Sequence, residues 1–156
     1  MDQVLESKPL GNSDRADRRI PLVFLDTSVI IGYLRGESSA LNLFSAEADG
    51  RIHFAVNSIV LQELLLVADA AARPGLERVS DHFKVLPVDF AKAEALIPRA
   101  RALRNRLAHA NDVLILSSAR ECDFLVSSDD RWKGLVTAEG PEFVTAEELV
   151  ARLRAT

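Results

Sequence analysis

The chain has 156 residues, of which 48% are hydrophobic and 27% charged, a composition typical of one globular domain. Its formal net charge of −4 excludes a general polyanion binder, so attraction to nucleic acid would need a local basic patch or bound metal cations. The single cysteine, Cys122, excludes an intramolecular disulfide and a cysteine-rich zinc site, and it fits a reducing cytoplasm. No stretch has the length and apolarity of a membrane span.

The first 19 residues contain four acids and four bases together with proline, glycine and serine. They have no apolar core of the kind that a signal peptide requires. We therefore expect residues 1–19 to be a disordered tail, followed by one domain over residues 20–156.

Short apolar runs alternate with helical segments along the rest of the chain. We expect strands at 22–25, 52–56, 84–88, 123–127 and 142–144. We expect helices at 29–34, from a start within the turn 36–39 to a stop at Gly50, and at 58–69, 76–82, 89–107 (kinked or split at Pro98), 111–121 and, after a Thr145–Glu148 capping box, at the end of the chain. This alternation predicts a three-layer α/β/α sandwich around a mostly parallel sheet.

An acid follows the first strand where open α/β sheets place their ligands. Residues 22–25 are wholly apolar, as expected of a strand buried on both faces, and the run ends in Asp26-Thr27-Ser28. A carboxylate at the carboxyl end of a central strand is a candidate site residue. The alternative is that Asp26 or Thr27 only caps the next helix.

Glu63 interrupts an apolar helix. Ile59 and Val67, four residues to either side, share its face, so helix geometry places this carboxylate on an apolar stripe. A buried carboxylate needs a cation, a hydrogen-bond network or a shifted pKa. The alternative is a partly exposed acid that pairs with an arginine.

Two further acids lie at the ends of predicted elements. Asp112 opens a helix that Asn111 is expected to cap, and a helix dipole favours an acid there whatever its function. Asp129 follows the fourth strand, which repeats the arrangement after the first. Turn chemistry explains such a residue equally well, and Asp130 competes with it for the same role.

In a parallel sheet these acids can converge at one edge. Several carboxylates within a few ångströms repel one another unless a cation is present. Oxygen-only ligation suits Mg²⁺ or Mn²⁺ better than zinc, and such ions activate water for phosphodiester cleavage. The sequence therefore predicts a site for one or two Mg²⁺ or Mn²⁺ ions formed by Asp26, Glu63, Asp112 and Asp129.

Four segments resemble, in order and spacing, the PIN-domain ribonucleases, and within them the VapC toxins of bacterial toxin–antitoxin pairs. They are residues 24–30 (FLDTSVI), 58–64 (SIVLQEL), 111–115 (NDVLI) and 125–129 (LVSSD). The likeness extends from about residue 22 to the C-terminus, and the four motifs together make it specific. The chain departs from the pattern in its long N-terminal extension and in Ser127, where the family most often has threonine.

The resemblance implies a metal-dependent endoribonuclease whose acidic site is formed by the same four residues. It also implies that the hydroxyl groups of Thr27 or Ser28, and of Ser127, orient the acids or a metal-bound water. A homodimer, a cytoplasmic location and a cognate antitoxin that occludes the site are further implications.

Basic and aromatic residues near the acids are possible RNA contacts. Arg131 and Lys133 flank Trp132 directly after Asp129, and a base could stack on the indole. A lone tryptophan in such a loop more often packs on the core. Arg35 could neutralise a phosphate, although simple exposure after a helix end explains it as well.

Three other functions compete with a nuclease. A phosphatase or phosphotransferase of the haloacid-dehalogenase type also begins with a strand-end aspartate, but it needs a second aspartate where this chain has Ser28, and Glu63 would be superfluous. A metal-dependent adhesion site would need serine in place of Ile30. A catalytically inactive PIN-like binding module is the remaining alternative, and the presence of all four acids argues against it.

Overall fold

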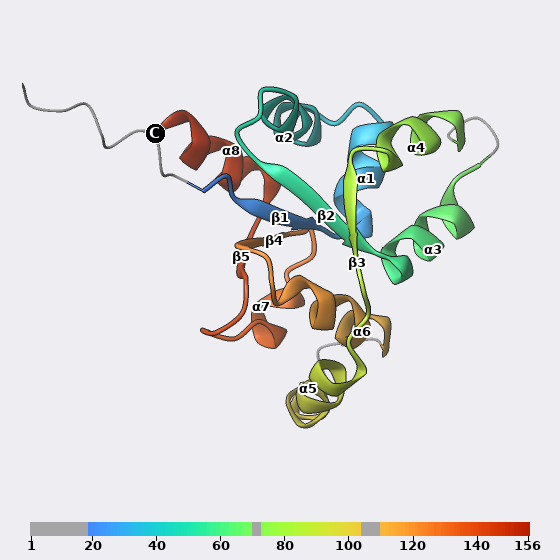
Figure 1. Cartoon of the computed structure of the whole chain (residues 1–156), viewed down its shortest axis with the longest axis vertical. Helices are drawn as coiled ribbons and strands as arrows, with labels where there is room; N and C mark the ends of the chain where they lie inside the picture. Colours follow the sequence, from blue (N-terminus) through green and yellow to red (C-terminus); the bar gives the residue numbers. More distant parts are fainter. Residues whose placement is uncertain (1–18, 70–72, 104–109) are drawn as a thin grey trace, which may run out of the picture.

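A five-stranded parallel sheet forms the middle of the protein (Figure 1). Its strands lie in the order β3-β2-β1-β4-β5, and every neighbouring pair is parallel. The bounds are β1 (Leu22–Leu25), β2 (His53–Asn57), β3 (Phe83–Leu86), β4 (Phe124–Val126) and β5 (Glu142–Val144). The central position of β1 places Asp26 in the middle of the edge where the strands end.

The computed structural model describes residues 19–69, 73–103 and 110–156. The expected disordered tail, apart from Arg19, lies outside these ranges, as does the expected end of a helix near residue 107. Within the described ranges, no helix has the length and apolar character needed to cross a membrane.

Helices cover both faces of the sheet, which confirms the predicted three-layer architecture. They are α1 (Thr27–Leu34), α2 (Ser38–Ala48), α3 (Ser58–Val67), α4 (Arg73–Ser80), α5 (Phe90–Ala102), α6 (Ala110–Ala119), α7 (Trp132–Leu135) and α8 (Ala146–Arg154). Figure 1 shows α1, α2, α4 and α8 on one side of the sheet and α5, α6 and α7 on the other. Helix α3 leaves the end of β2 and packs against both α1 and α6.

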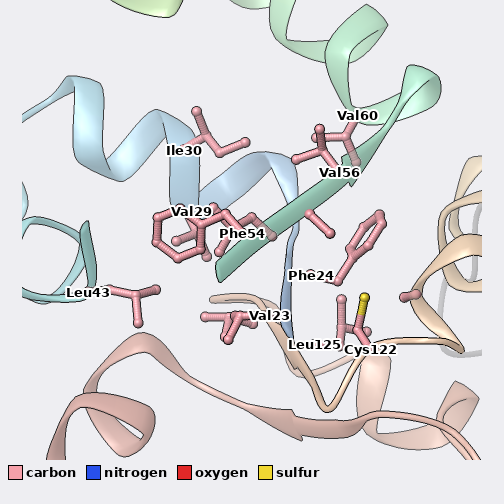
Figure 2. Packing of buried hydrophobic residues seen from close by; sticks show 14 of the residues in the cluster. Val23, Phe24, Val29, Ile30, Leu43, Phe54, Val56, Val60, Cys122 and Leu125 are labelled. Atoms are coloured by element: carbon pink, nitrogen blue, oxygen red, sulfur yellow. The ribbon is translucent and has the colours of Figure 1, made fainter. Parts of the chain in front are cut away.

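The core is built on β1, whose residues Val23, Phe24 and Leu25 are fully buried. Figure 2 shows Ile30 of α1, Leu43 of α2 and Val60 of α3 gathered around the strands. An apolar strand with a helical layer on each face needs no polar alternation. This burial explains why Asp26 follows β1 and does not lie within it.

The predicted elements are present, with shifted boundaries. Helix α4 begins at Arg73 rather than at 76, because a proline such as Pro74 is tolerated in a first helical turn. Pro98 lies inside α5 without splitting it. The short helix α7 was not predicted, since four residues are too few to show a helical period.

Candidate acidic site

Asp26 is buried, with 4% of its surface exposed, and its carboxylate is held by three donors, two of which come from the segment after β4. Its Oδ2 accepts hydrogen bonds from Ser127 Oγ at 2.7 Å, Ser28 Oγ at 3.3 Å and Trp132 Nε1 at 3.3 Å. The alternative of simple capping is wrong, because the Asp26 side chain makes no capping hydrogen bond to α1. These three donors fix the orientation of the carboxylate.

The loop after β4 is fastened to the loop after β1 through serine hydroxyl groups. Ser127 Oγ accepts a hydrogen bond from the backbone N–H of Asp129 at 3.0 Å. Ser28 Oγ accepts one from the backbone N–H of Ser128 at 3.2 Å, and the two serine oxygens lie 3.4 Å apart. The segment that carries Asp129 is therefore fixed relative to Asp26.

Glu63 is half-buried and hydrogen-bonded at both carboxylate oxygens. Thr27 Oγ1 donates to its Oε2 at 2.6 Å, and Asn111 Nδ2 donates to its Oε1 at 3.1 Å. The predicted apolar stripe is only partly buried, because Leu66 and Val67 of the same helix are exposed. A hydrogen-bond network is thus the partner that this carboxylate required.

Asn111 was predicted to cap α6, and that prediction is wrong. The helix already begins at Ala110, so Asn111 lies in its first turn. Its side-chain amide is engaged across the site by Glu63. The residue therefore links the helix of Asp112 to the helix of Glu63.

Asn57, the last residue of β2, holds α3 and α6 together. It caps α3, its Oδ1 accepting from the backbone N–H groups of Ile59 and Val60 at 3.1 Å each. Its Nδ2 also donates to Leu114 O at 3.2 Å and Ser118 Oγ at 3.0 Å on α6. The side chain is fully buried, so all of these bonds lie away from water.

Asp112 and Asp129 are bridged by the guanidinium of Arg131. Its Nε lies 3.4 Å from Asp112 Oδ2 and 3.1 Å from Asp129 Oδ2. The backbone N–H of Arg131 also donates to Asp129 Oδ1 at 3.0 Å. The competing acid, Asp130, has an exposed side chain that pairs with Lys133 at 3.3 Å.

The four acids therefore belong to one network at the carboxyl ends of β1 and β4. Asp26 connects to Asp129 through Ser127, Asp129 connects to Asp112 through Arg131, and Glu63 binds the residue that follows Asp26. Among the residues that the structure describes, no three acidic, histidine or cysteine side chains are close enough to hold one metal ion. In this arrangement the four carboxylates interact with hydrogen-bond donors of the protein and with the guanidinium of Arg131.

The sequence model of the PIN domain matches residues 23–136, a range that includes all four acids. The chain belongs to the PIN-domain family. Among curated proteins, none matches it.

Solved structures share the fold of this PIN domain. VapBC2 from Rickettsia felis, bound to a DNA fragment from its promoter, is 19% identical with a TM-score of 0.62, covering 80% of this chain and 98% of that chain. A toxin–antitoxin complex from Klebsiella pneumoniae is 19% identical with a TM-score of 0.54, covering 80% and 97%. DNA-bound VapBC from Salmonella typhimurium is 18% identical with a TM-score of 0.53, covering 81% and 98%.

Two of the residues predicted to contact RNA, Trp132 and Arg131, contact acids of the site instead. Stacking of a base on Trp132 is excluded, because the indole is fully buried against the core and bonded to Asp26. The guanidinium of Arg131 contacts acids of the site itself. Arg35, just past the end of α1, and Lys133 are exposed.

Proposed function

We propose that this PIN domain is a metal-dependent endoribonuclease that hydrolyses RNA phosphodiester bonds and acts as the toxin of a VapBC-type pair. The observation that carries the proposal is that four acids from four separate segments lie near one edge of the sheet: Asp26 and Asp129 are linked through Ser127, Asp129 and Asp112 through the Arg131 ion pairs, and Glu63 is bonded to Thr27 and Asn111. Membership of a family whose proteins are generally nucleases supports the same activity.

The donor set fits Mg²⁺ or Mn²⁺, because it consists of carboxylate oxygens with hydroxyl groups beside them. Asp26, Glu63, Asp112 and Asp129 would hold one or two ions. A bound ion supplies an activated water and neutralises charge on the attacking and leaving oxygens. The chain's own contribution is orientation, since Ser127 and Trp132 fix Asp26 and Thr27 fixes Glu63.

The direct test is RNA cleavage by the purified protein with Mg²⁺ or Mn²⁺, with and without EDTA. We expect cleavage to stop in EDTA and Asp26→Asn to abolish it while the fold is kept. Asp130→Asn is the matched control, because Asp130 is an exposed acid in the same loop and should not be needed. Cleavage at the wild-type rate by Asp26→Asn would show that the site is assigned wrongly.

A phosphate monoester assayed beside RNA separates a nuclease from a phosphatase. The proposed function predicts hydrolysis of RNA and not of the monoester. Hydrolysis of the monoester and not of RNA would show that the protein is a phosphatase. Binding of RNA without cleavage of either substrate would indicate an inactive binding module.

Positive charge for RNA is proposed to come from exposed side chains beside the site. Arg35 and Lys133 are exposed, and Arg131 adds charge within the acidic network. Replacing Lys133 and Arg35 by glutamine should weaken RNA binding and flatten its dependence on salt. An unchanged salt slope would remove both residues from the RNA-binding surface.

A cognate antitoxin and a second copy of the chain are the proposed partners, in the cytoplasm. Structures titled as toxin–antitoxin complexes share the fold, which supports the antitoxin. A groove of about 810 Å³ lies between α1, α2 and α4, and its apolar lining residues are Tyr33, Leu34, Leu41, Phe44, Pro74 and Val79. We propose that an apolar segment of the antitoxin binds in this groove. Leu66 of α3 and Phe90 of α5, 78% and 75% exposed, are apolar surface available to a homodimer.

The molecular mass of the protein in solution tests whether it forms a dimer. Leu66→Glu should convert a dimer to a monomer if α3 forms the contact, while Leu41→Glu in the antitoxin groove should leave the dimer intact. A wild-type protein that is monomeric at micromolar concentration would end the dimer proposal without affecting the nuclease assignment.

A further inference from the structure

The acidic site holds a cation that the chain itself supplies. Arg131 Nε lies within 3.4 Å of Asp112 Oδ2 and 3.1 Å of Asp129 Oδ2, and the Asp112 side chain is 4% exposed. A buried aspartate beside a second carboxylate is costly unless a positive charge is close. The guanidinium meets that need in the metal-free protein.

The contact lacks the features of a permanent structural ion pair. Stable arginine–carboxylate pairs are hydrogen-bonded, often through two parallel N–H groups. Arg131 Nε is buried and has no hydrogen-bond partner, although two carboxylate oxygens lie near it. Attraction between charges therefore holds the guanidinium there, and a competing cation can replace it.

The backbone around Arg131 is fixed, so only its side chain has to move. Its backbone N–H is bonded to Asp129, and the next residue, Trp132, is fully buried. The Arg131 side chain is 27% exposed, which leaves it a direct path to solvent. Withdrawal would remove the guanidinium from Asp112 Oδ2 and Asp129 Oδ2, and a divalent ion could then take its place beside these two oxygens.

We infer that Arg131 is a resident counter-cation that occupies the space between Asp112 and Asp129 until a divalent ion displaces it. The inference rests on the proposed function, because it concerns the same acids. It makes Arg131 a positioning residue that lowers metal affinity and stabilises the metal-free fold. Site loading then becomes an exchange of one cation for another.

Calorimetric titration with MnCl₂ tests the exchange on the full chain. We expect Arg131→Gln to bind Mn²⁺ more tightly than the wild type, by on the order of tenfold, because the Arg131 guanidinium no longer has to be displaced. Lys133→Gln is the matched control: it removes the same charge two residues away, from a side chain that pairs with Asp130 instead. Its Mn²⁺ affinity should stay within about twofold of the wild type, since exposed charges interact weakly.

Thermal unfolding in EDTA and in MnCl₂ provides a second readout. Arg131→Gln should unfold at a lower temperature than the wild type in EDTA and should gain more from Mn²⁺. Arg131→Lys, which keeps a positive charge, should restore part of the stability in EDTA and bind Mn²⁺ with intermediate affinity. If Arg131→Gln is unfolded in EDTA, Arg131→Lys provides the test. Its affinity for Mn²⁺ is then expected to be higher than that of the wild type.

The outcomes separate this inference from the proposed function. Equal or weaker Mn²⁺ binding by Arg131→Gln and Arg131→Lys, with clear binding by the wild type, overturns the exchange and leaves the metal site standing. Absence of Mn²⁺ binding by every variant and by the wild type overturns the metal site itself, and the exchange with it.

Discussion

The indole Nε1 of Trp132 donates a hydrogen bond to Oδ2 of Asp26 across 3.3 Å, although the two residues are 106 positions apart. Both side chains are buried, so this bond is formed away from water. The indole therefore has two functions: it fills the core under the loop after β4, and it orients the central carboxylate of the site.

Trp132→Phe keeps an aromatic ring and removes the donor. We expect the free energy of unfolding in urea to fall by about 1 to 3 kcal/mol, because a hydrogen bond to a buried charged group is lost. Nuclease activity should fall by about 10- to 100-fold, the usual effect of losing a group that orients a metal ligand. Unchanged activity in a folded Trp132→Phe protein would assign the indole to packing alone.

Thr27 tests the orientation of Glu63 with two nearly isosteric changes. Thr27→Val removes the 2.6 Å hydrogen bond to Glu63 Oε2, whereas Thr27→Ser keeps a hydroxyl group. Cleavage by the valine variant should be about 10- to 100-fold slower, and the serine variant should remain close to the wild type. Equal rates for the two variants would show that this hydroxyl is dispensable.

Asn57→Ala should destabilise the fold strongly. It removes the cap of α3 and leaves Leu114 O and Ser118 Oγ on α6 without the amide donor. We expect a loss of about 2 to 4 kcal/mol in urea unfolding, from the cap and from hydrogen bonds broken in the core. Asn42→Ala, an exposed change on α2, is the control and should cost less than about 0.5 kcal/mol.

Cys122 gives a prediction in alkaline solution. Burial, with smaller contributions from the neighbouring Asp123 and Glu121 carboxylates, raises the pKa of this thiol to about 12 from an ordinary value of 9.0. Above pH 9 the unfolded chain loses the thiol proton while the folded protein keeps it, so stability falls as the pH rises. The full stabilisation from the thiol is present only below pH 9.

The measurement is the free energy of unfolding of the wild type and of Cys122→Ala at several pH values. Between pH 9 and 12 the wild type should lose up to about 1.4 kcal/mol per pH unit more than the variant. Below pH 9 the difference between the two proteins should be constant. Parallel curves across the whole range would contradict the buried, protonated thiol.

The sequence was sufficient to predict the sheet and the places of the acids. Buried parallel strands are apolar along their whole length, so Asp26 and Asp129 stand out where the apolar runs end. Glu63 was conspicuous for the same reason within an apolar helix. In each case a local violation of the hydrophobic pattern gave the signal.

The contacts among side chains could not be predicted in the same way. Asn111 was expected to be a cap, because its bond to Glu63 joins segments 48 residues apart and leaves no local pattern. For Trp132 the alternative of packing on the core is confirmed, but neither its bond to Asp26 nor the contact of Arg131 with Asp112 could be predicted. The direction of a side chain depends on tertiary packing, which neighbouring residues in the sequence do not reveal.

The strand order has a consequence for the protein during its own synthesis. Strand β1 pairs with β4, with Leu25 opposite Val126, so the middle of the sheet stays incomplete until the last third of the chain exists. A nascent chain that stops before Ser127 lacks the hydroxyl, the indole and the arginine that organise the acids. Assembly of the acids therefore has to wait until β4 and the loop that follows it have been synthesised, after β1, β2 and β3 already exist.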